Sequence, residues 1–483
     1  DINAGASGGN HGLLHSGARY IDSDPSSARE CRDEGTILKR LAPQCIEETG
    51  GLFVAVQGDE ETYVADFADR CRRCGIDAIF VDPKDALEME PSLSADTIAA
   101  FAVPDAAIDP FKLSLDNFAQ AGTLGSSLLL HHQVVGFVQR NGRIEAVRLR
   151  DRRDGNEVHV YADQIVNASG AWAGEVAALA GARINMVYSQ GSLIVSQMRL
   201  GERVLNRLRK PADADILMPA GTVSIFGTTS KRIDAPDQCR PTTSEIDAMI
   251  DDGMAMVPKL ADTRFIRAYA GVRPLVRSGN GSDDRAVSRG FSLLDHESEG
   301  LENFITITGG KLTTYRLMAE KTADLVCRRL GNNSPCRTSV EPLPGSSEGR
   351  YTEPGHTPKL WFKKNDASDL LLCECEMVPT SVFNEIAASL TNNGHRPGLR
   401  EMGQRSRVGK GPCQGSFCSL RMAAHMCNEG MLKDGEAVGE LKDFLNERWR
   451  GIQPLLWGPA VSQAELQEAL HCGLLNLDVS ESA

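Results

Sequence analysis

Apolar side chains recur along this chain at two spacings, one typical of helices and one typical of strands. Residues 26–42 have apolar side chains at helical intervals, which predicts a helix. The apolar run GLFVAV at 51–56 then predicts a strand. Residues 61–76 predict a second helix that stops at Gly75, and 109–121 predict a third, which begins at an Asp-Pro pair. The first quarter of the chain therefore mixes helices with strands.

The middle of the chain is richer in strands. Residues 126–151 alternate apolar and polar positions on either side of the pair Asn141-Gly142, which is typical of a hairpin turn. Residues 162–181 then predict a strand, a turn of small residues and a helix. Helices and strands alternate at both ends of the first 330 residues while hairpins fill the middle, so we expect an α/β fold with an inserted, mostly antiparallel sheet.

The composition changes beyond about residue 330. The stretch 331–366 is rich in Pro, Gly and Ser and has few apolar runs, which predicts a linker. Residues 378–391 and 414–431 then predict two short helices.

Length and charge narrow the class of protein. The chain has 483 residues, enough for two or three domains, and its 52 basic and 65 acidic residues give a net charge of −13. No Lys/Arg-rich run is present, so we expect no nucleic-acid partner. No run approaches the ~18 consecutive apolar residues of a membrane span, and no signal-peptide pattern opens the chain. The 13 cysteines, an odd number scattered along a long chain, favour a reducing cytoplasm over a disulfide framework.

Three Gly-rich segments carry candidate ligand-binding chemistry. They are GASGGNHG at 5–12, IVNASGAWA at 165–173 and FITITGGKLTTYRLMAE at 304–320. Small residues leave backbone N–H groups open to a pyrophosphate or a flavin ring, and a helix N-terminus favours negative charge. The third segment is not a Walker loop, because Ile305 and Leu312 stand where that motif needs Gly and Ser or Thr. Each segment alone is also compatible with simple tight packing.

The chain begins at Asp1, next to the first of these segments. A dinucleotide-binding fold places a strand, a G-x-G-x-x-G turn and a ribose-binding acid before such a segment, and none of the three is present here. We therefore expect the sequence to lack the N-terminal part of a longer protein, and the chain alone to bind a dinucleotide poorly.

Four cysteines form a candidate metal centre near the C-terminal end. The pattern is C-x-C, a gap of 37 residues and C-x4-C, contributed by Cys373, Cys375, Cys413 and Cys418. Four thiolates suit a soft tetrahedral centre, so an iron-sulfur cluster, structural zinc and free thiols all remain open at this point. The C-x-x-C pair of Cys71 and Cys74 lies on a predicted helix with no second pair nearby, and we interpret it as two ordinary helix cysteines.

The combined motifs resemble a known family. The segments NHGLLHSGARY, GTTS, YAGVRPLV and ITGGKLTTYRLMAE look like the FAD-dependent glycerol-3-phosphate dehydrogenases of the D-amino-acid-oxidase-like superfamily. The cysteine-bearing segments LLCECEMV and GPCQGSFC resemble the bacterioferritin-associated-ferredoxin-like [2Fe-2S] domain. Together they indicate the anaerobic branch of the dehydrogenase family.

The resemblance implies a domain plan. It consists of a Rossmann-like FAD-binding domain whose N-terminal strand and GxGxxG turn are missing here, an inserted substrate sheet, and a small helical [2Fe-2S]-binding domain. The expected limits are 1–330 for the FAD-dependent oxidoreductase domain (FAD parts about 1–42, 106–182 and 300–330; substrate parts about 43–105 and 183–299), 331–366 for the linker, 367–428 for the [2Fe-2S] domain and 429–483 for a C-terminal tail.

The resemblance also implies an activity. We expect oxidation of sn-glycerol 3-phosphate to dihydroxyacetone phosphate by hydride transfer to FAD, with electrons passing through the [2Fe-2S] cluster to partner subunits and a membrane quinone. The chain would then be cytoplasmic and peripheral at the inner face of the cell membrane. Two alternatives stay open: a related FAD enzyme that acts on an opine, amino acid or hydroxy acid, and a non-catalytic electron-transfer fragment.

Site residues follow from the same motifs. Arginine suits a phosphate because its planar fork is always charged. The resemblance implies substrate binding by Arg19, Tyr20, Arg273 and Arg289 and catalysis by His15, Lys311 and Arg273, with His11 as a further candidate base. It implies cofactor binding by Ser7, Gly8, His11, Gly12, Val135, Ala168, Gly170, Trp172, Gly309, Gly310, Lys311, Leu312 and Thr313.

Overall fold

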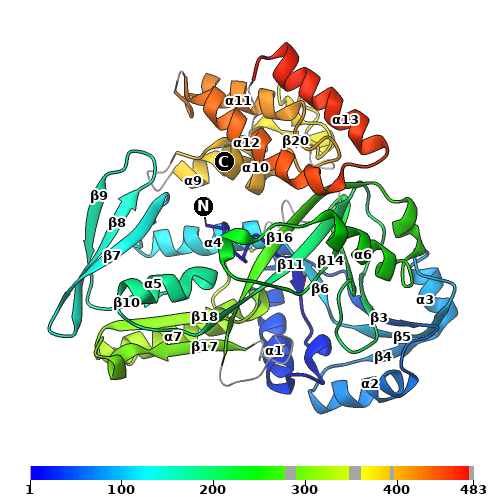
Figure 1. Cartoon of the computed structure of the whole chain (residues 1–483), viewed down its shortest axis with the longest axis horizontal. Coiled ribbons are helices and arrows are strands. Elements are labelled where there is room, and N and C mark those ends of the chain that lie inside the picture. Colours follow the sequence, from blue (N-terminus) through cyan, green and yellow to red (C-terminus); the bar gives the residue numbers. More distant parts are fainter. Residues whose placement is uncertain (1, 278–289, 347–360, 392–395, 434, 478–483) are drawn as a thin grey trace.

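A computed structural model describes residues 2–277, 290–346, 361–391, 396–433 and 435–477 (Figure 1). Its elements form a large sheet with covering helices, a smaller α/β layer, and a group of C-terminal helices that is yellow to red at the top of Figure 1. The α/β fold class predicted from the sequence is confirmed. Within the described ranges, no helix combines the length and apolar character needed to cross a membrane.

The large sheet has nine strands in the described part of the chain. The strands pair antiparallel except for β3 with β12, so the expected antiparallel insert is present. The longest pairing joins β11 to β16. The strands are β3 (Gly51–Val56), β4 (Ile79–Val81), β5 (Thr97–Val103), β11 (Met186–Ser196), β12 (Val204–Arg207), β13 (Ile216–Ala220), β14 (Val223–Gly227), β15 (Lys231–Ile233) and β16 (Phe265–Val276).

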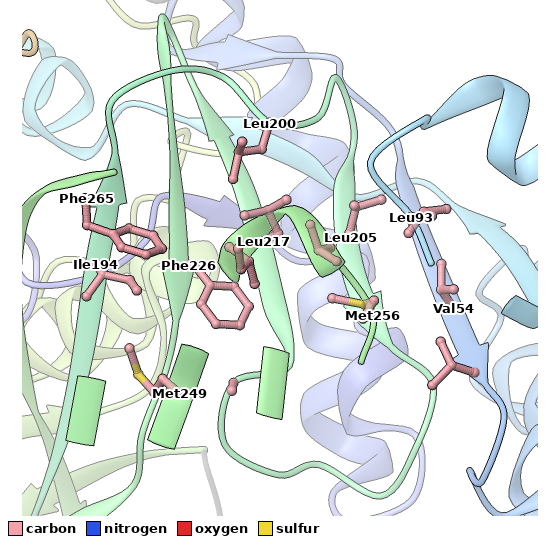
Figure 2. Close-up of a cluster of buried hydrophobic side chains, with 14 of the residues drawn as sticks. Val54, Leu93, Ile194, Leu200, Leu205, Leu217, Phe226, Met249, Met256 and Phe265 are labelled. Carbon is pink, nitrogen blue, oxygen red and sulfur yellow. The ribbon is translucent and has the colours of Figure 1, made fainter. Parts of the chain in front are cut away.

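Both faces of this sheet are buried. Leu52 and Val54 of β3 lie in the hydrophobic cluster of Figure 2 together with Phe226, whereas Phe53 lies in a second cluster on the opposite face. Because side chains alternate along a strand, a strand that is buried on both faces reads as a continuous apolar run, which explains GLFVAV. The covering helices are α3 (Pro83–Met89) and α6 (Thr243–Gly253) on the first face and α1 (Pro25–Leu41) and α2 (Glu61–Arg73) on the second.

The smaller layer contains the parallel pair of β10 (Ile165–Asn167) and β18 (Phe304–Gly309), with β17 (Phe291–Asp295) antiparallel to β18. Parallel strands end at the same edge of a sheet, so the two Gly-rich turns that follow β10 and β18 lie side by side. The remaining elements are α4 (Pro110–Thr123), α5 (Ala173–Leu179), α7 (Tyr315–Arg329), the meander β7 (His132–Arg140), β8 (Arg143–Asp151) and β9 (Glu157–Tyr161), and the short strands β1 (Leu13–Leu14), β2 (Ile46–Glu47) and β6 (Ala106–Ile108).

The C-terminal helices share one hydrophobic core. Phe383, Met402, Met422 and Phe444 are fully buried in it, and Phe444 comes from the predicted tail. The predicted limit between residues 428 and 429 therefore does not separate two hydrophobic cores. The elements are β19 (Leu371–Cys373), β20 (Val378–Pro379), α9 (Thr380–Thr391), α10 (Leu399–Ser406), α11 (Cys418–Asn428), α12 (Glu436–Ile452) and α13 (Pro459–Glu468).

This C-terminal core is docked on the rest of the chain through specific contacts. Helix α12 packs against β16, where Arg267 forms an ion pair with Glu447. Thr222, in the turn between β13 and β14, donates a hydrogen bond of 2.8 Å to the Glu376 carboxylate. The predicted linker also takes part in the packing, because Leu343 is buried and its N–H donates to the carbonyl of Leu41.

Candidate functional site

A cavity of about 600 Å³ lies between the smaller layer and the large sheet. Three Gly-rich segments that are far apart in the sequence contribute to its wall, together with the middle of β11 and the second half of β16. Its lining includes Ser7, Gly9, His11, His15, Arg19, Tyr20, Ala168, Gly170, Trp172, Gly191, Gly271, Arg273, Gly309, Gly310, Lys311 and Leu312. Cavities of this size are typical of small-molecule and cofactor sites.

Two glycines set the closest contact in the wall. A Cβ on Gly271 of β16 would lie 2.0 Å from the carbonyl oxygen of Gly9, and a Cβ on Gly9 would lie 2.8 Å from the Gly271 Cα. One turn of the 5–12 segment therefore rests on the β16 backbone, which no larger residue permits. Tyr269, two residues before Gly271, fixes the same segment by donating a hydrogen bond of 2.9 Å to the Asn10 carbonyl.

The turn after β18 brings a lysine to the cavity. Gly309 and Gly310 have φ values of 84° and 71°, a region that favours glycine, and they turn the chain before Lys311. The Lys311 Nζ lies 4.6 Å from the centre of the Tyr20 ring. Thr313, two residues after Lys311, is buried, and its Oγ1 accepts a hydrogen bond of 3.2 Å from the His15 backbone N–H.

Arg273 enters the cavity from β16. Its Nη1 donates to the Thr229 carbonyl at 3.0 Å, and its Nη2 donates to the Thr228 Oγ1 at 2.6 Å. Gly191 on β11 makes room for the guanidinium, because a Cβ at that position would lie 2.4 Å from Nη2. The side chain of Arg273 is thus held in one orientation by β11 and by the turn after β14.

A second arginine is held by a buried carboxylate. Arg19 donates from Nη2 to the Asp215 Oδ2 at 2.8 Å and to the Ala212 carbonyl at 3.2 Å. Asp215 is fully buried and also accepts a bond of 2.8 Å from Arg209 Nε. Arg209 is also paired with Asp252, so these ion pairs fix the orientation of Arg19 beside the cavity.

His11, His15 and Tyr20 form an aromatic group in the same wall. The His15 Nε2 lies 3.4 Å from the Tyr20 Oη, and the His11 and His15 ring centres are 5.9 Å apart. Burial, with Arg273 and Arg19 as further causes, lowers the pKa of His11 to about 3, so its ring is neutral near pH 7. Its Nδ1 accepts the Leu13 N–H at 3.2 Å, which places the ring proton of the neutral form on Nε2.

The four C-terminal cysteines lie together in one row. Thiol hydrogen bonds join Cys373 to Cys418, Cys418 to Cys413 and Cys413 to Cys375. The bond from Cys418, with the backbone N–H of Gly415 among the further causes, lowers the pKa of Cys413 to about 5. The donating thiol of Cys418 has a raised pKa.

Four neighbouring thiols are a possible ligand set for a metal centre. Among the described residues, no group of three or more His, Cys, Asp or Glu side chains is arranged to hold one metal ion. A zinc ion takes four ligands around one point, whereas in a [2Fe-2S] cluster each of the two irons takes two of the four thiolates. The donor set of four thiols suits either centre.

Comparison with known proteins identifies the family. A model of the FAD dependent oxidoreductase family (DAO) matches residues 1–325. The chain belongs to this family. It is 41% identical to the A subunit of the anaerobic glycerol-3-phosphate dehydrogenase of Escherichia coli (strain K12), over 99% of its own length and 91% of that protein. It is 36% identical to the A1 subunit of the Haloferax volcanii enzyme of the same name, over 100% and 86% of the two chains. The resemblance inferred from the sequence is thus confirmed.

Solved structures show the same fold. The glycerol-3-phosphate dehydrogenase of Bacillus halodurans in complex with FAD matches with a TM-score of 0.58 and 20% identity, covering 100% of this chain and 90% of that one. The L-α-glycerophosphate oxidase of Mycoplasma pneumoniae with FAD bound matches with a TM-score of 0.53 and 17% identity, covering 71% and 89%. FAD is therefore the cofactor of this family's fold, and the Gly-rich cradle of the 600 Å³ cavity suits it.

Most residues predicted for the site lie around this cavity, with five exceptions. Gly8 and Gly12 line a second cavity on the other side of the 5–12 segment, and Thr313 is covered by His15. Val135 on β7 is not among the described residues that line the cavity. Arg289 lies outside the described residues.

Sequence reasoning missed the residues that orient the arginines. Thr228, Asp215 and Gly191 act through contacts with strands far away in the sequence, and only Thr228 falls within a segment, GTTS, that carried the family resemblance. Cys71 on α2 and Cys74 just after its end are buried and form no disulfide.

The lowered pKa of His11 predicts an acid-dependent loss of stability. The folded pKa of about 3 lies below the ordinary value of 6.5, so the unfolded chain binds one more proton as the pH falls below 6.5. Between pH 6.5 and 5, protonation of His11 in the unfolded chain lowers the free energy of unfolding by up to about 2 kcal/mol. Denaturant titrations of wild type and His11→Gln at both pH values measure this free energy of unfolding. The variant should lose less stability than the wild type on acidification.

The matched control is His159→Gln, at an exposed histidine of β9. It should lose as much stability as the wild type. Equal acid sensitivity in all three proteins would contradict a buried, neutral His11.

Proposed function

We propose that this chain oxidises sn-glycerol 3-phosphate to dihydroxyacetone phosphate with FAD as hydride acceptor. The observation that carries the proposal is the placement of Arg273, Arg19 and Lys311 around the cavity that the FAD-type backbone segments line. In a chain with a net charge of −13, three cations at one cavity favour an anionic substrate. The relatives named as glycerol-3-phosphate dehydrogenases support a phosphate ester.

Arg273 is the residue proposed to hold the phosphate. Its guanidinium is oriented by Thr228 and Thr229, so little rotamer freedom is lost when an anion binds. Arg19 and Tyr20 add positive charge and a hydroxyl donor at the same wall. Bidentate hydrogen bonds from arginine to phosphate are shorter and stronger than neutral ones.

His15 is the residue proposed to accept the hydroxyl proton. His11 is unsuited to this role, because its low pKa and its occupied Nδ1 leave Nε2–H as a donor. His15 is buried beside the cavity with its Nε2 close to Tyr20. Lys311, above the Tyr20 ring, is proposed to stabilise negative charge that develops at the reacting centre.

FAD, when bound, supplies the two-electron acceptor for the hydride of the substrate C2 carbon. The residues proposed to hold it are those of the Gly-rich wall: Ser7, Gly9, His11, Ala168, Gly170, Trp172, Gly309, Gly310, Lys311 and Leu312. The Gly, Ala and Ser residues among them leave backbone N–H groups open to a close approach of the flavin and the pyrophosphate.

The cysteine row is proposed to hold a [2Fe-2S] cluster. Such a cluster supplies one-electron transfer, which complements the two-electron chemistry of a flavin. We further propose partner subunits that take the electrons to a membrane quinone, with this chain peripheral at the inner face of the cell membrane. Support comes from the relatives, which are called subunits of a larger enzyme.

The substrate proposal predicts a selective effect of Arg273. Arg273→Gln should lower kcat/KM for glycerol 3-phosphate by roughly tenfold to a hundredfold, because a charge-assisted hydrogen bond is lost. Arg140→Gln, at an exposed arginine of β7, is the matched control and should change nothing. The rate of dye reduction by each holoenzyme with glycerol 3-phosphate, 2-hydroxyglutarate or hydroxyproline measures the effect of both substitutions. Turnover of a carboxylate substrate in place of the phosphate ester would favour the related dehydrogenases.

The cluster proposal predicts the metal content. The holoenzyme should contain two iron and two acid-labile sulfide per chain. Cys418→Ser, in the middle of the row, should lose most of both, whereas Cys71→Ser on α2 should keep them. Iron, sulfide and zinc assays on the purified proteins decide the question, and stoichiometric zinc in a colourless protein would refute the cluster.

A further inference from the structure

A second cavity, of about 320 Å³, lies between the oxidoreductase part of the chain and the docked C-terminal helices. It is separated from the first cavity by the 5–12 segment, because Gly5, Gly9, Asn10 and His11 line both. Its opposite wall comes from α10, from α12 and from the loop before the cysteines. Nothing in the proposed oxidation uses this space.

The lining of this cavity is rich in positive charge. Three acidic side chains also line it. Glu447 is paired with Arg267, Glu47 is paired with Arg199 at 2.8 Å, and the Asp109 carboxylate caps α4 by accepting two backbone N–H groups. The five cationic residues of the lining are Arg267, Arg400, Arg407, Lys410 and Arg448. Arg407 is paired with Glu376 at 2.8 Å, so cations still outnumber carboxylates around the cavity.

Arg448 is the most deeply placed of these cations. The residue is only 7% exposed, and its Nε has no hydrogen-bond partner among the described residues. The guanidinium stacks on the Phe444 ring at 4.9 Å, and its Nε lies 3.7 Å from a Glu447 carboxylate oxygen that Arg267 already binds. Burial lowers the pKa of Arg448 to about 10, with repulsion from Arg267 as a further cause.

Lys410 is half-buried, and no described carboxylate forms an ion pair with it. Its Nζ donates to the Gln404 carbonyl at 2.6 Å and lies 4.3 Å from the centre of the Phe111 ring. Burial lowers the pKa of Lys410 to about 7, against the opposing attraction of the Asp109 carboxylate. Cations whose charge is only partly balanced are costly to remove from water, and an anion in the cavity would offset that cost.

We propose that this interdomain cavity binds a phosphate-bearing anion. Several cations on different elements converge on one space, and guanidinium groups match the oxygens of a phosphate with parallel hydrogen bonds. Inorganic phosphate and a phosphate monoester share this chemistry. The site is separate from the substrate cavity, where Arg273 lies on the other side of the 5–12 segment. An anion here would also tie α10 and α12 to the oxidoreductase part of the chain.

Calorimetric titration of the holoenzyme with inorganic phosphate tests the proposal. We expect two phosphate sites per chain in the wild type and one in Arg273→Gln. In the Arg273→Gln background, Lys410→Met should weaken the remaining site about tenfold or more, because a charged donor is lost. Arg450→Gln, at an exposed arginine on the same helix as Arg448, is the matched control and should leave both sites intact.

Two further measurements show whether an effect of Lys410→Met comes from loss of folding, and whether a phosphate ester binds at the same site as inorganic phosphate. In the Arg273→Gln background and without phosphate, Lys410→Met should lower the Tm by little, because no ion pair of Lys410 is lost. With phosphate, the Arg273→Gln protein should gain Tm, and the double variant should gain clearly less. Glycerol 3-phosphate should bind to Arg273→Gln at the same site, in competition with inorganic phosphate. A single phosphate site that Arg273→Gln abolishes would overturn the second site and leave the proposed oxidation untouched.

Discussion

The pairing of β16 with β11 is the constraint on which both candidate sites depend. Alternate residues of a strand point to the same face, so Arg267, Tyr269, Gly271 and Arg273 follow one another along one side of β16. They contact, in order, the docked helix α12, the Asn10 carbonyl, the Gly9 backbone and the substrate cavity. One strand face, about 20 Å long over residues 267–273, therefore sets the positions of the C-terminal core, the Gly-rich wall and Arg273.

This arrangement gives the 5–12 segment two faces with different tasks. One face lines the cavity suited to FAD, and the other lines the cationic cavity next to the cysteine loop. At Gly9 the backbone of the segment lies directly on the backbone of Gly271, because neither residue has a side chain. The cysteine row is fixed to the same body, because Glu376, next to Cys375, bonds both Thr222 and Arg407. The cavity suited to FAD and the four neighbouring cysteines thus lie in connected parts of a single framework.

Much of this could be predicted from the sequence, because local patterns and motifs determined it. The run GLFVAV, the helix ends at Gly75 and Asp109, and the family motifs indicated the α/β fold and most of the cavity wall. Contacts between distant segments could not be predicted. Nothing local indicates that Gly191 makes room for Arg273, that Asp215 holds Arg19, or that Phe444 completes the core of the cysteine region.

The central claim is that one chain joins substrate oxidation at a flavin to a one-electron centre made by four thiolates. Low-temperature EPR of the holoenzyme, frozen at intervals after mixing with glycerol 3-phosphate, tests it most directly. We expect the signal of a reduced [2Fe-2S] cluster to appear as the flavin bleaches, to be delayed in Arg273→Gln and to be absent in Cys418→Ser. A flavin that bleaches while the wild-type protein stays without any cluster signal would contradict this coupling.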